Sequence, residues 1–163
     1  MNRNEYNSCV TEYADGLFRF IFKSMQQKEM AEDIVQNSFE TLWLHHQEVE
    51  MAKAKSYLFT VAYRKMIDEI RKNKRTISVS EHHENMSQTE PNIQFDTKKI
   101  IHHAINTLPD IQKQLIMLKD HEGYNYEEMA SITGLNLGQI KISLFRARTT
   151  LKKQLSGIYH PQA

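Results

Sequence analysis

The side chains with the clearest chemistry lie between Leu137 and Leu155, where basic residues alternate with apolar ones. This stretch has no acidic residue and five basic residues, Lys141, Arg146, Arg148, Lys152 and Lys153. Lys and Arg bind DNA phosphates, and Arg also donates paired hydrogen bonds to the edge of a guanine. Ile142 and Phe145 could meet the methyl group of a thymine. The residue types predict noncovalent recognition of duplex DNA.

A helix over this stretch would separate an inner side from an outer one. At about 100° per residue, one stripe is apolar and consists of Ile140, Leu144, Ala147, Leu151 and Leu155. The opposite side carries Gln139, Ile142, Phe145, Arg146 and Thr149, with Lys141 and Lys152 on its flank. An alternative explanation is that Ile142 and Phe145 pack against another part of the protein. The absence of acidic residues favours a surface that faces phosphates.

The residues before this helix predict a helix-turn-helix. Asn125 with Glu128, and Asn136 with Gln139, have the spacing of capping boxes, which mark helix starts. Gly134 lies between them, at a position where a helix end favours a left-handed residue. Two helices joined by a three-residue turn with glycine make the motif.

Hydrophobic periodicity predicts three helices in the first half of the chain, near residues 5–22, 28–46 and 55–72. The second has an apolar side with Ala31, Ile34, Val35, Phe39, Leu42 and Trp43, and a polar side that is either solvated or ready for a partner. The third interleaves aromatic with basic residues, as single-stranded nucleic-acid binders do. Its aromatic residues could equally be core, with the basic run stabilising the helix C-terminus.

Charge divides the chain into three parts. Residues 1–75 hold 12 basic and 11 acidic residues. Residues 76–97 hold no basic and 4 acidic residues, and residues 98–163 hold 9 basic and 5 acidic residues. The middle part is polar, includes Pro91 and lacks periodicity, so we expect a flexible acidic linker. The predicted fold is all-α, with a helical domain at 1–75, the linker at 76–97, and a four-helix domain at 98–157 that ends in the helix-turn-helix.

The motifs of most enzyme classes are absent. There is no phosphate-binding glycine loop, nucleophile elbow or zinc-protease motif. Cys9 is the single cysteine, and six of the histidines form adjacent pairs, which point about 100° apart on a helix and chelate poorly. We therefore expect no enzyme activity, no metal and no cofactor. No apolar run approaches a membrane span and no signal peptide is visible, which predicts a cytoplasmic protein.

Three blocks in order resemble the extracytoplasmic-function (ECF) sigma factors of bacterial RNA polymerase. AEDIVQNSFETLW at 31–43 resembles their helix that binds core polymerase, and YLFTVAYRKMIDEIRKNKR at 57–75 resembles their −10 recognition and melting helix. The block at 107–151, from TLPDIQ to RARTTL, is similar to their −35-binding domain. The resemblance covers nearly the whole chain.

The resemblance implies partners and site residues. Its partners are core RNA polymerase, through the clamp coiled coil of the largest subunit and the flap of the second largest, promoter DNA, and an anti-sigma factor. The polymerase-binding residues it implies are Glu32, Asp33, Gln36 and Phe39. The residues that it implies for binding the −10 element are Tyr57, Tyr63, Arg64, Arg71 and Lys72. Those that it implies for binding the −35 element are Gln139, Lys141, Ile142, Phe145 and Arg146.

The chain departs from the family pattern at two places. Tyr63-Arg64 stand where the family often has Arg-Asn, so we expect a different pocket for the −10 base. Ile142 and Ser143 stand where Ser and Arg are common, which predicts an altered −35 preference.

Two other functions fit parts of the sequence. One is a free-standing helix-turn-helix repressor or activator, which would need dimerisation to read two half-sites. The other is an interaction protein that sequesters regulators and makes no DNA contact.

Overall fold

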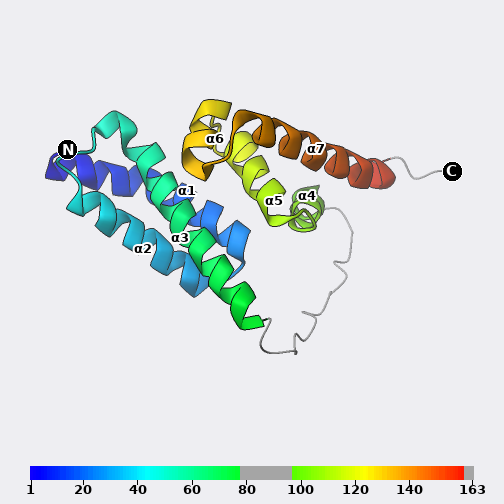
Figure 1. Cartoon of the computed structure of the whole chain (residues 1–163), viewed down its shortest axis with the longest axis horizontal. Helices are drawn as coiled ribbons and strands as arrows, with labels where there is room; N and C mark the ends of the chain where they lie inside the picture. Colours follow the sequence, from blue (N-terminus) through cyan, green and yellow to red (C-terminus); the bar gives the residue numbers. More distant parts are fainter. Residues whose placement is uncertain (78–96, 160–163) are drawn as a thin grey trace.

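The computed structural model describes residues 1–77 and 97–159, and these residues form helices and connecting turns without a strand. The first group of helices is α1 (Arg3–Met25), α2 (Lys28–Leu44), the short 3₁₀ helix η1 (Met51–Lys53) and α3 (Ala54–Ile77). The second group is α4 (Thr97–Asn106), α5 (Asp110–Ile116), η2 (Met117–His121), α6 (Tyr126–Thr133) and α7 (Leu137–Tyr159). Figure 1 shows the two groups side by side, with α7 extending away from the first group. The all-α prediction is confirmed.

Helices α1, α2 and α3 pack pairwise into a three-helix bundle. A capping box begins α1: the Glu5 amide donates to Asn2 Oδ1 (2.9 Å), and the Asn2 amide donates to Glu5 Oε2 (2.7 Å). Gln26 ends the helix in a left-handed conformation, with φ 58°. The fully buried side chains of the bundle include Leu17, Phe20, Ile21, Leu42, Leu58, Phe59 and Met66.

The second group forms the predicted four-helix domain. Helix α5 runs into the π-helical turn η2, so that one continuous rod extends from Asp110 to His121. Helix α7 packs against α4, α5 and α6. Its apolar stripe, with Ile140, Leu144 and Ala147, is buried in the same core as Leu115, Leu118, Met129 and Ile132.

Helix limits differ modestly from those predicted. Helix α2 ends at Leu44, two residues before the predicted limit, because the chain turns over residues 45–49, where the amides of Glu48 and Val49 donate to the His45 carbonyl. Trp43, in the last turn of α2, is 41% exposed, so its predicted placement on the buried side of the helix was wrong. Most of the predicted linker, residues 78–96, lies outside the described residues, as do residues 160–163.

The two groups also contact each other. Helix α3 packs against α6, and α1 against α5. Their buried apolar side chains form one continuous cluster, which joins Phe20 and Phe59 of the first group to Tyr124 and Met129 of the second. The described residues therefore adopt a closed arrangement of the two helical groups.

Candidate nucleic-acid and polymerase interface

The turn before α7 sets the direction of the helix. The Gln139 amide donates to Asn136 Oδ1 (2.8 Å), and the Asn136 amide donates to Gln139 Oε1 (3.0 Å). Asn125 and Glu128 form the matching pair at α6, with both distances 2.8 Å. Gly134 has φ +75°, the left-handed conformation that ends α6. Both predicted capping boxes and the glycine turn are confirmed.

The outer side of α7 is free of tertiary packing. Phe145 is 71% exposed and Ile142 is 53% exposed, while Arg146 beside them is also exposed. The inner residues Ile140 and Leu144 are buried. Exposure of two large apolar side chains between basic residues rules out, for the described part of the chain, the alternative that they pack within the protein. This side of α7 is therefore an exposed surface on which apolar and basic side chains lie together.

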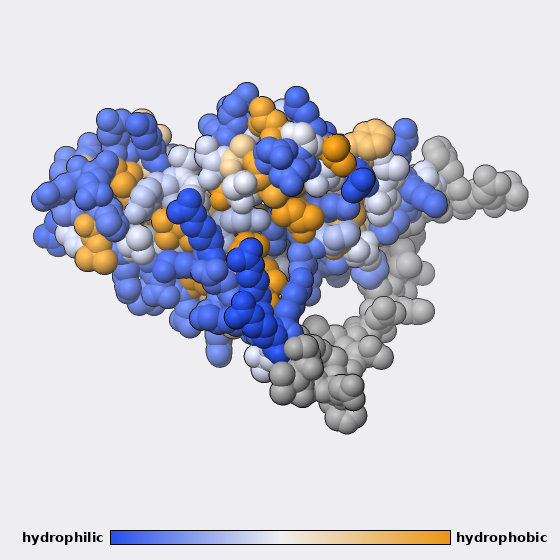
Figure 2. Space-filling view, in the orientation of Figure 1, coloured by the Kyte–Doolittle hydropathy of each residue, from blue (hydrophilic) through white to orange (hydrophobic). Residues whose placement is uncertain are grey.

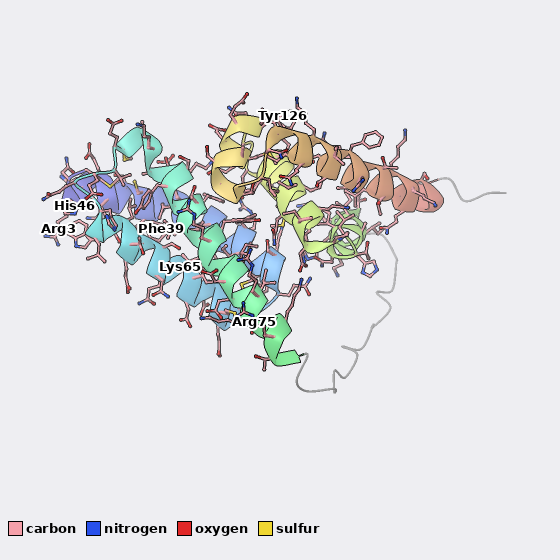
Figure 3. All side chains as sticks on the ribbon, viewed as in Figure 1. Arg3, Phe39, His46, Lys65, Arg75 and Tyr126 are labelled. Atoms are coloured by element: carbon pink, nitrogen blue, oxygen red, sulfur yellow. The ribbon has the colours of Figure 1, made fainter. Side chains whose placement is uncertain are left out.

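Tyr126 organises the cations next to this surface, a role that sequence reasoning missed. The Lys119 ammonium lies 5.0 Å from the centre of its ring and that of Lys141 lies 5.7 Å from it. Figure 3 labels Tyr126 at the start of α6. Arg148 instead pairs with Asp120 at 3.2 Å. Among these basic residues of α7, Arg148 is therefore engaged in an ion pair within the domain, whereas Arg146, next to Phe145 in the helix, is exposed.

The predicted −10 residues on α3 separate into two classes. Arg64, Arg71 and Lys72 are exposed, Tyr57 is half-buried, and Tyr63 is only 5% exposed. Burial raises the pKa of the Tyr63 hydroxyl. Figure 2 shows a continuous hydrophilic strip where α3 faces the viewer, and Figure 3 labels Lys65 and Arg75 along this helix. In the closed arrangement, α3 therefore offers charge rather than aromatic rings.

The predicted polymerase-binding residues of α2 also divide by exposure. Glu32, Asp33 and Gln36 are exposed, whereas Phe39 is 7% exposed and its carbonyl accepts a hydrogen bond from the Tyr6 hydroxyl (3.1 Å). Figure 3 labels Phe39 where α2 lies against the rest of the bundle. Three polar side chains thus form a surface, and Phe39 holds the helix beneath it.

An apolar surface next to this polar one was not predicted. Trp43 packs on Tyr6 (ring centres 4.9 Å apart) and on His46 (4.7 Å), and Leu44 beside it is 78% exposed. Tyr6, Trp43 and Leu44 line a cavity of about 470 Å³ together with Arg3, Asn7 and Glu40. Little in the sequence signals that α2 ends beside this surface, because the turn at residues 45–49 has no glycine or proline to mark it.

Burial perturbs two further titratable groups at the junction between the helical groups. Burial raises the pKa of the Tyr124 hydroxyl, and Glu122 and Glu128 raise it further. Partial burial lowers the pKa of the His102 imidazole, and the positive charges of Lys23, Lys113 and His121 lower it further. Tyr124 and His102 therefore lie where side chains from both halves of the chain come close together.

Among residues 1–77 and 97–159, no three His, Cys, Asp or Glu side chains are grouped in a way that could hold a metal ion. Within the same residues, no helix has the length and apolar character required to cross a membrane.

Two family models match this chain in the regions just described. The Sigma-70 region 2 model matches residues 9–76, and the Sigma-70 region 4 model matches residues 98–151. The first match spans α1–α3 and the second spans α4 to most of α7.

Relatives and solved structures agree with these matches. The chain is 30% identical to the ECF RNA polymerase sigma factor SigM of Bacillus subtilis, over 86% of this chain and 88% of SigM. It is also 30% identical to RNA polymerase sigma factor SigV of the same bacterium, over 91% and 90% of the two chains. The sigma factor RpoE of Bartonella quintana, solved with the anti-sigma factor NepR, superposes with a TM-score of 0.77 at 25% identity, covering 94% of this chain and 98% of that one. CnrH, solved with the cytosolic domain of CnrY, shares the fold at a TM-score of 0.65 and 17% identity, over 95% and 90% of the two chains.

Proposed function

The chain belongs to the ECF sigma factors, which bind core RNA polymerase and direct promoter recognition, and on that premise we propose which of its surfaces performs each task. The assignment divides the chain into residues 1–75, which bind polymerase and the −10 element, a linker at 76–97, and residues 98–157, which bind the −35 element. Family membership favours this role over that of a free-standing helix-turn-helix regulator.

The exposed side of α7 reads the −35 element. Arg146 supplies paired donors for a guanine, Phe145 and Ile142 supply apolar contacts for thymine methyl groups, and Lys141 and Gln139 contact the flanking backbone or bases. The observation that carries this assignment is the 71% exposure of Phe145 in a helix whose opposite side buries Ile140, Leu144 and Ala147.

The exposed basic residues of α3 contact the −10 element. Arg64, Arg71 and Lys72 neutralise phosphates, and Tyr57 at the half-buried edge of the helix can stack on an unpaired base. Tyr63 reaches a base only if the surroundings of α3 rearrange, because it is buried in the closed arrangement.

The polar side of α2 binds the clamp coiled coil of the largest polymerase subunit through Glu32, Asp33 and Gln36. We add Trp43 and Leu44 to this surface, since large apolar side chains exposed beside a polar rim are typical of the centre of an interface. Phe39 acts from beneath the surface by fixing the position of α2.

The proposed role also implies a cellular location for the chain and a class of inhibitor. A polymerase subunit works where the polymerase is, so we assign the chain to the cytoplasm. RpoE was solved with an anti-sigma factor and CnrH with the cytosolic domain of CnrY, and a protein of the anti-sigma class is the corresponding partner proposed here.

Reconstituted transcription tests the assignment of α2. Asp33→Ala should weaken binding to core polymerase and reduce run-off product from a promoter that depends on this chain, because it removes an exposed charge from the proposed interface. The matched control is Asp15→Ala, which removes another exposed carboxylate, from α1. Equal loss in both variants, or loss of helical circular dichroism in Asp33→Ala alone, would contradict a contact role for Asp33.

A further inference from the structure

One face of α4 lines a cavity of about 530 Å³. Its residues stand at positions i, i+3, i+4, i+7 and i+8, which fall on the same side of a helix: Lys98, Ile101, His102, Ile105 and Asn106. The remaining wall comes from Lys99 beside this face, Lys23 of α1, and Met117 and His121 of η2. Small-molecule sites measure about 300–1,000 Å³, so the cavity has the size of such a site. None of its residues belongs to the surfaces proposed for DNA or polymerase.

The charged side chains of this cavity are all basic or titrate to a cation. Lys23 comes from one side and Lys98 and Lys99 from the other, which gives three ammonium groups. His102 and His121 add two imidazoles, and none of the described residues that line the cavity is acidic. Burial lowers the pKa of the His102 imidazole, and the positive charges around it lower it further. Several cations in one hollow favour a ligand that carries more than one negative charge.

The rest of the wall is apolar and includes one unsatisfied polar atom. Ile101 is a large apolar side chain that is 39% exposed, and Ile105 and Met117 line the same cavity. Asn106 Oδ1 is buried and accepts no hydrogen bond from the described residues. A buried acceptor without a donor is destabilising, so a ligand N–H group at this position would be favourable. The wall therefore suits a flat, largely apolar group with a polar edge.

We propose that this cavity is a binding site for a nucleoside polyphosphate. The phosphates bind the three lysines, the base lies against Ile101 and Met117, and an N–H group of the base donates to Asn106 Oδ1. Asparagine amides recognise the edge of adenine in this way in DNA complexes. Inorganic polyphosphate leaves the apolar wall and Asn106 unused, and a fatty carboxylate brings a single charge and no donor. The nucleotide is the one of these three ligand classes that matches the cations, the apolar wall and the unpaired oxygen together.

Calorimetric titration of the full-length chain with ATP, in the absence of divalent cations, tests the site. ATP should bind about tenfold more tightly than tripolyphosphate, which lacks the base, and adenosine, which lacks the phosphates, should bind more weakly still. Asn106→Ala should bring the affinity for ATP to within about twofold of that for tripolyphosphate, because it removes the acceptor for the base. Equal affinities of the parent chain for ATP and tripolyphosphate would overturn the proposal.

Single lysines distinguish this site from general attraction to a basic surface. Lys23→Gln should weaken ATP binding about fivefold, because it removes one charged contact to the phosphates. Lys153→Gln is the matched control: it removes the same charge from an exposed position on α7 and should leave the affinity within about twofold. If Lys23→Gln loses helical circular dichroism, Lys99→Gln at an exposed position makes the same test. Equal losses in the cavity variant and the control would overturn the proposal.

Methyl NMR with isotope-labelled methionine locates the ligand. Met117 lines the cavity, whereas Met51 of η1 contacts Cys9, with Sδ and Sγ 3.4 Å apart. ATP should shift the methyl signal of Met117, identified through Met117→Leu, and leave that of Met51 in place. No shift at Met117, or a shift there at lower concentrations of a single-stranded oligonucleotide than of ATP, would overturn the proposal. These measurements use neither promoter nor polymerase, so their failure is distinct from failure of the roles proposed for α2, α3 and α7.

Discussion

Helices α3 and α7 have similar residue types and different surroundings. Each has more than twenty residues, each carries aromatic and basic side chains, and each lies in a segment that resembles a DNA-binding helix. In α7 the aromatic residue Phe145 is 71% exposed, whereas in α3 Tyr63 is 5% exposed and Phe59 is 1% exposed. The same residue types are thus exposed on one helix and part of the core on the other.

The difference follows from the neighbours of each helix. Helix α7 packs against α4, α5 and α6 of its own domain, so one side remains free. Helix α3 packs on α1 and α2 and is then covered by α6 from the second domain. The surface of α7 that we propose for the −35 element is therefore exposed in the closed chain, while on α3 the ring of Phe59 packs against Tyr124 of the second domain.

The largest expected effect is on stability and tests the comparison at the aromatic residues of the two helices. Tyr63→Ala should lower the free energy of unfolding by about 3 kcal/mol, because it opens a cavity in the core. Phe145→Ala should change it by less than about 0.5 kcal/mol, since its ring contacts mostly solvent. Urea unfolding followed by circular dichroism measures both. Tyr63→Phe, which keeps the ring, is the control and should stay close to the parent, and equal destabilisation by the two alanine variants would contradict the comparison.

The proposed role of α7 in DNA binding can be tested with its two arginines, Arg146 and Arg148. Arg146→Ala should weaken binding of the polymerase holoenzyme to the promoter by about 1–3 kcal/mol and relax the preference at one −35 base pair. Arg148→Ala is the matched variant, because Arg148 is engaged with Asp120 and its loss should leave base preference unchanged. Competition binding with −35 variants tests both. An equal loss on every promoter sequence would make Arg146 a phosphate contact.

The starts of the two helices provide a smaller test. Asn136→Ala should cost about 1 kcal/mol of stability, because Asn136 caps α7 by accepting from the Gln139 amide. Glu50→Ala, at the N-cap of η1 just before α3, should cost less than half as much, since Glu50 forms no capping hydrogen bond. Thermal unfolding of the two variants compares them directly. A larger loss of stability for Glu50→Ala than for Asn136→Ala would show that Glu50 stabilises the start of α3 and would contradict this prediction.

The smallest effect concerns pH and the contact between the domains. The pKa of His102 is lowered in the folded chain, so the unfolded chain binds more protons at acidic pH. The contribution of His102 to stability is present above its unfolded pKa of about 6.5 and is lost as the pH falls below that value. Positive groups face His102 from α1 (Lys23), α5 (Lys113) and η2 (His121). Unfolding measured at pH 8 and pH 5.5 should show a smaller decrease in Lys23→Gln, and an unchanged decrease would exclude Lys23 as a source of the effect.

Much of the second domain could be predicted because its signals are local. Capping boxes at Asn125 and Asn136 and the left-handed Gly134 act within a few residues, so they are readable in the sequence and recur in the structure. The exposed side of α7 was readable as well, since one stripe of apolar residues supplies its buried side chains. Trp43 was misplaced, because helical periodicity does not show how far neighbouring elements cover a side chain; its ring packs on Tyr6 and His46 and is still 41% exposed.

By itself, the sequence determined the helical class, the division of charge and the residues that α7 exposes on its outer side, because these depend on periodicity and on contacts between near neighbours. Only the tertiary structure decided that Phe59 and Tyr63 are buried and that Tyr124 closes the two halves together. A helical repeat shows which side of α3 is apolar, but it carries no information about a segment more than sixty residues away in the chain that covers a second side.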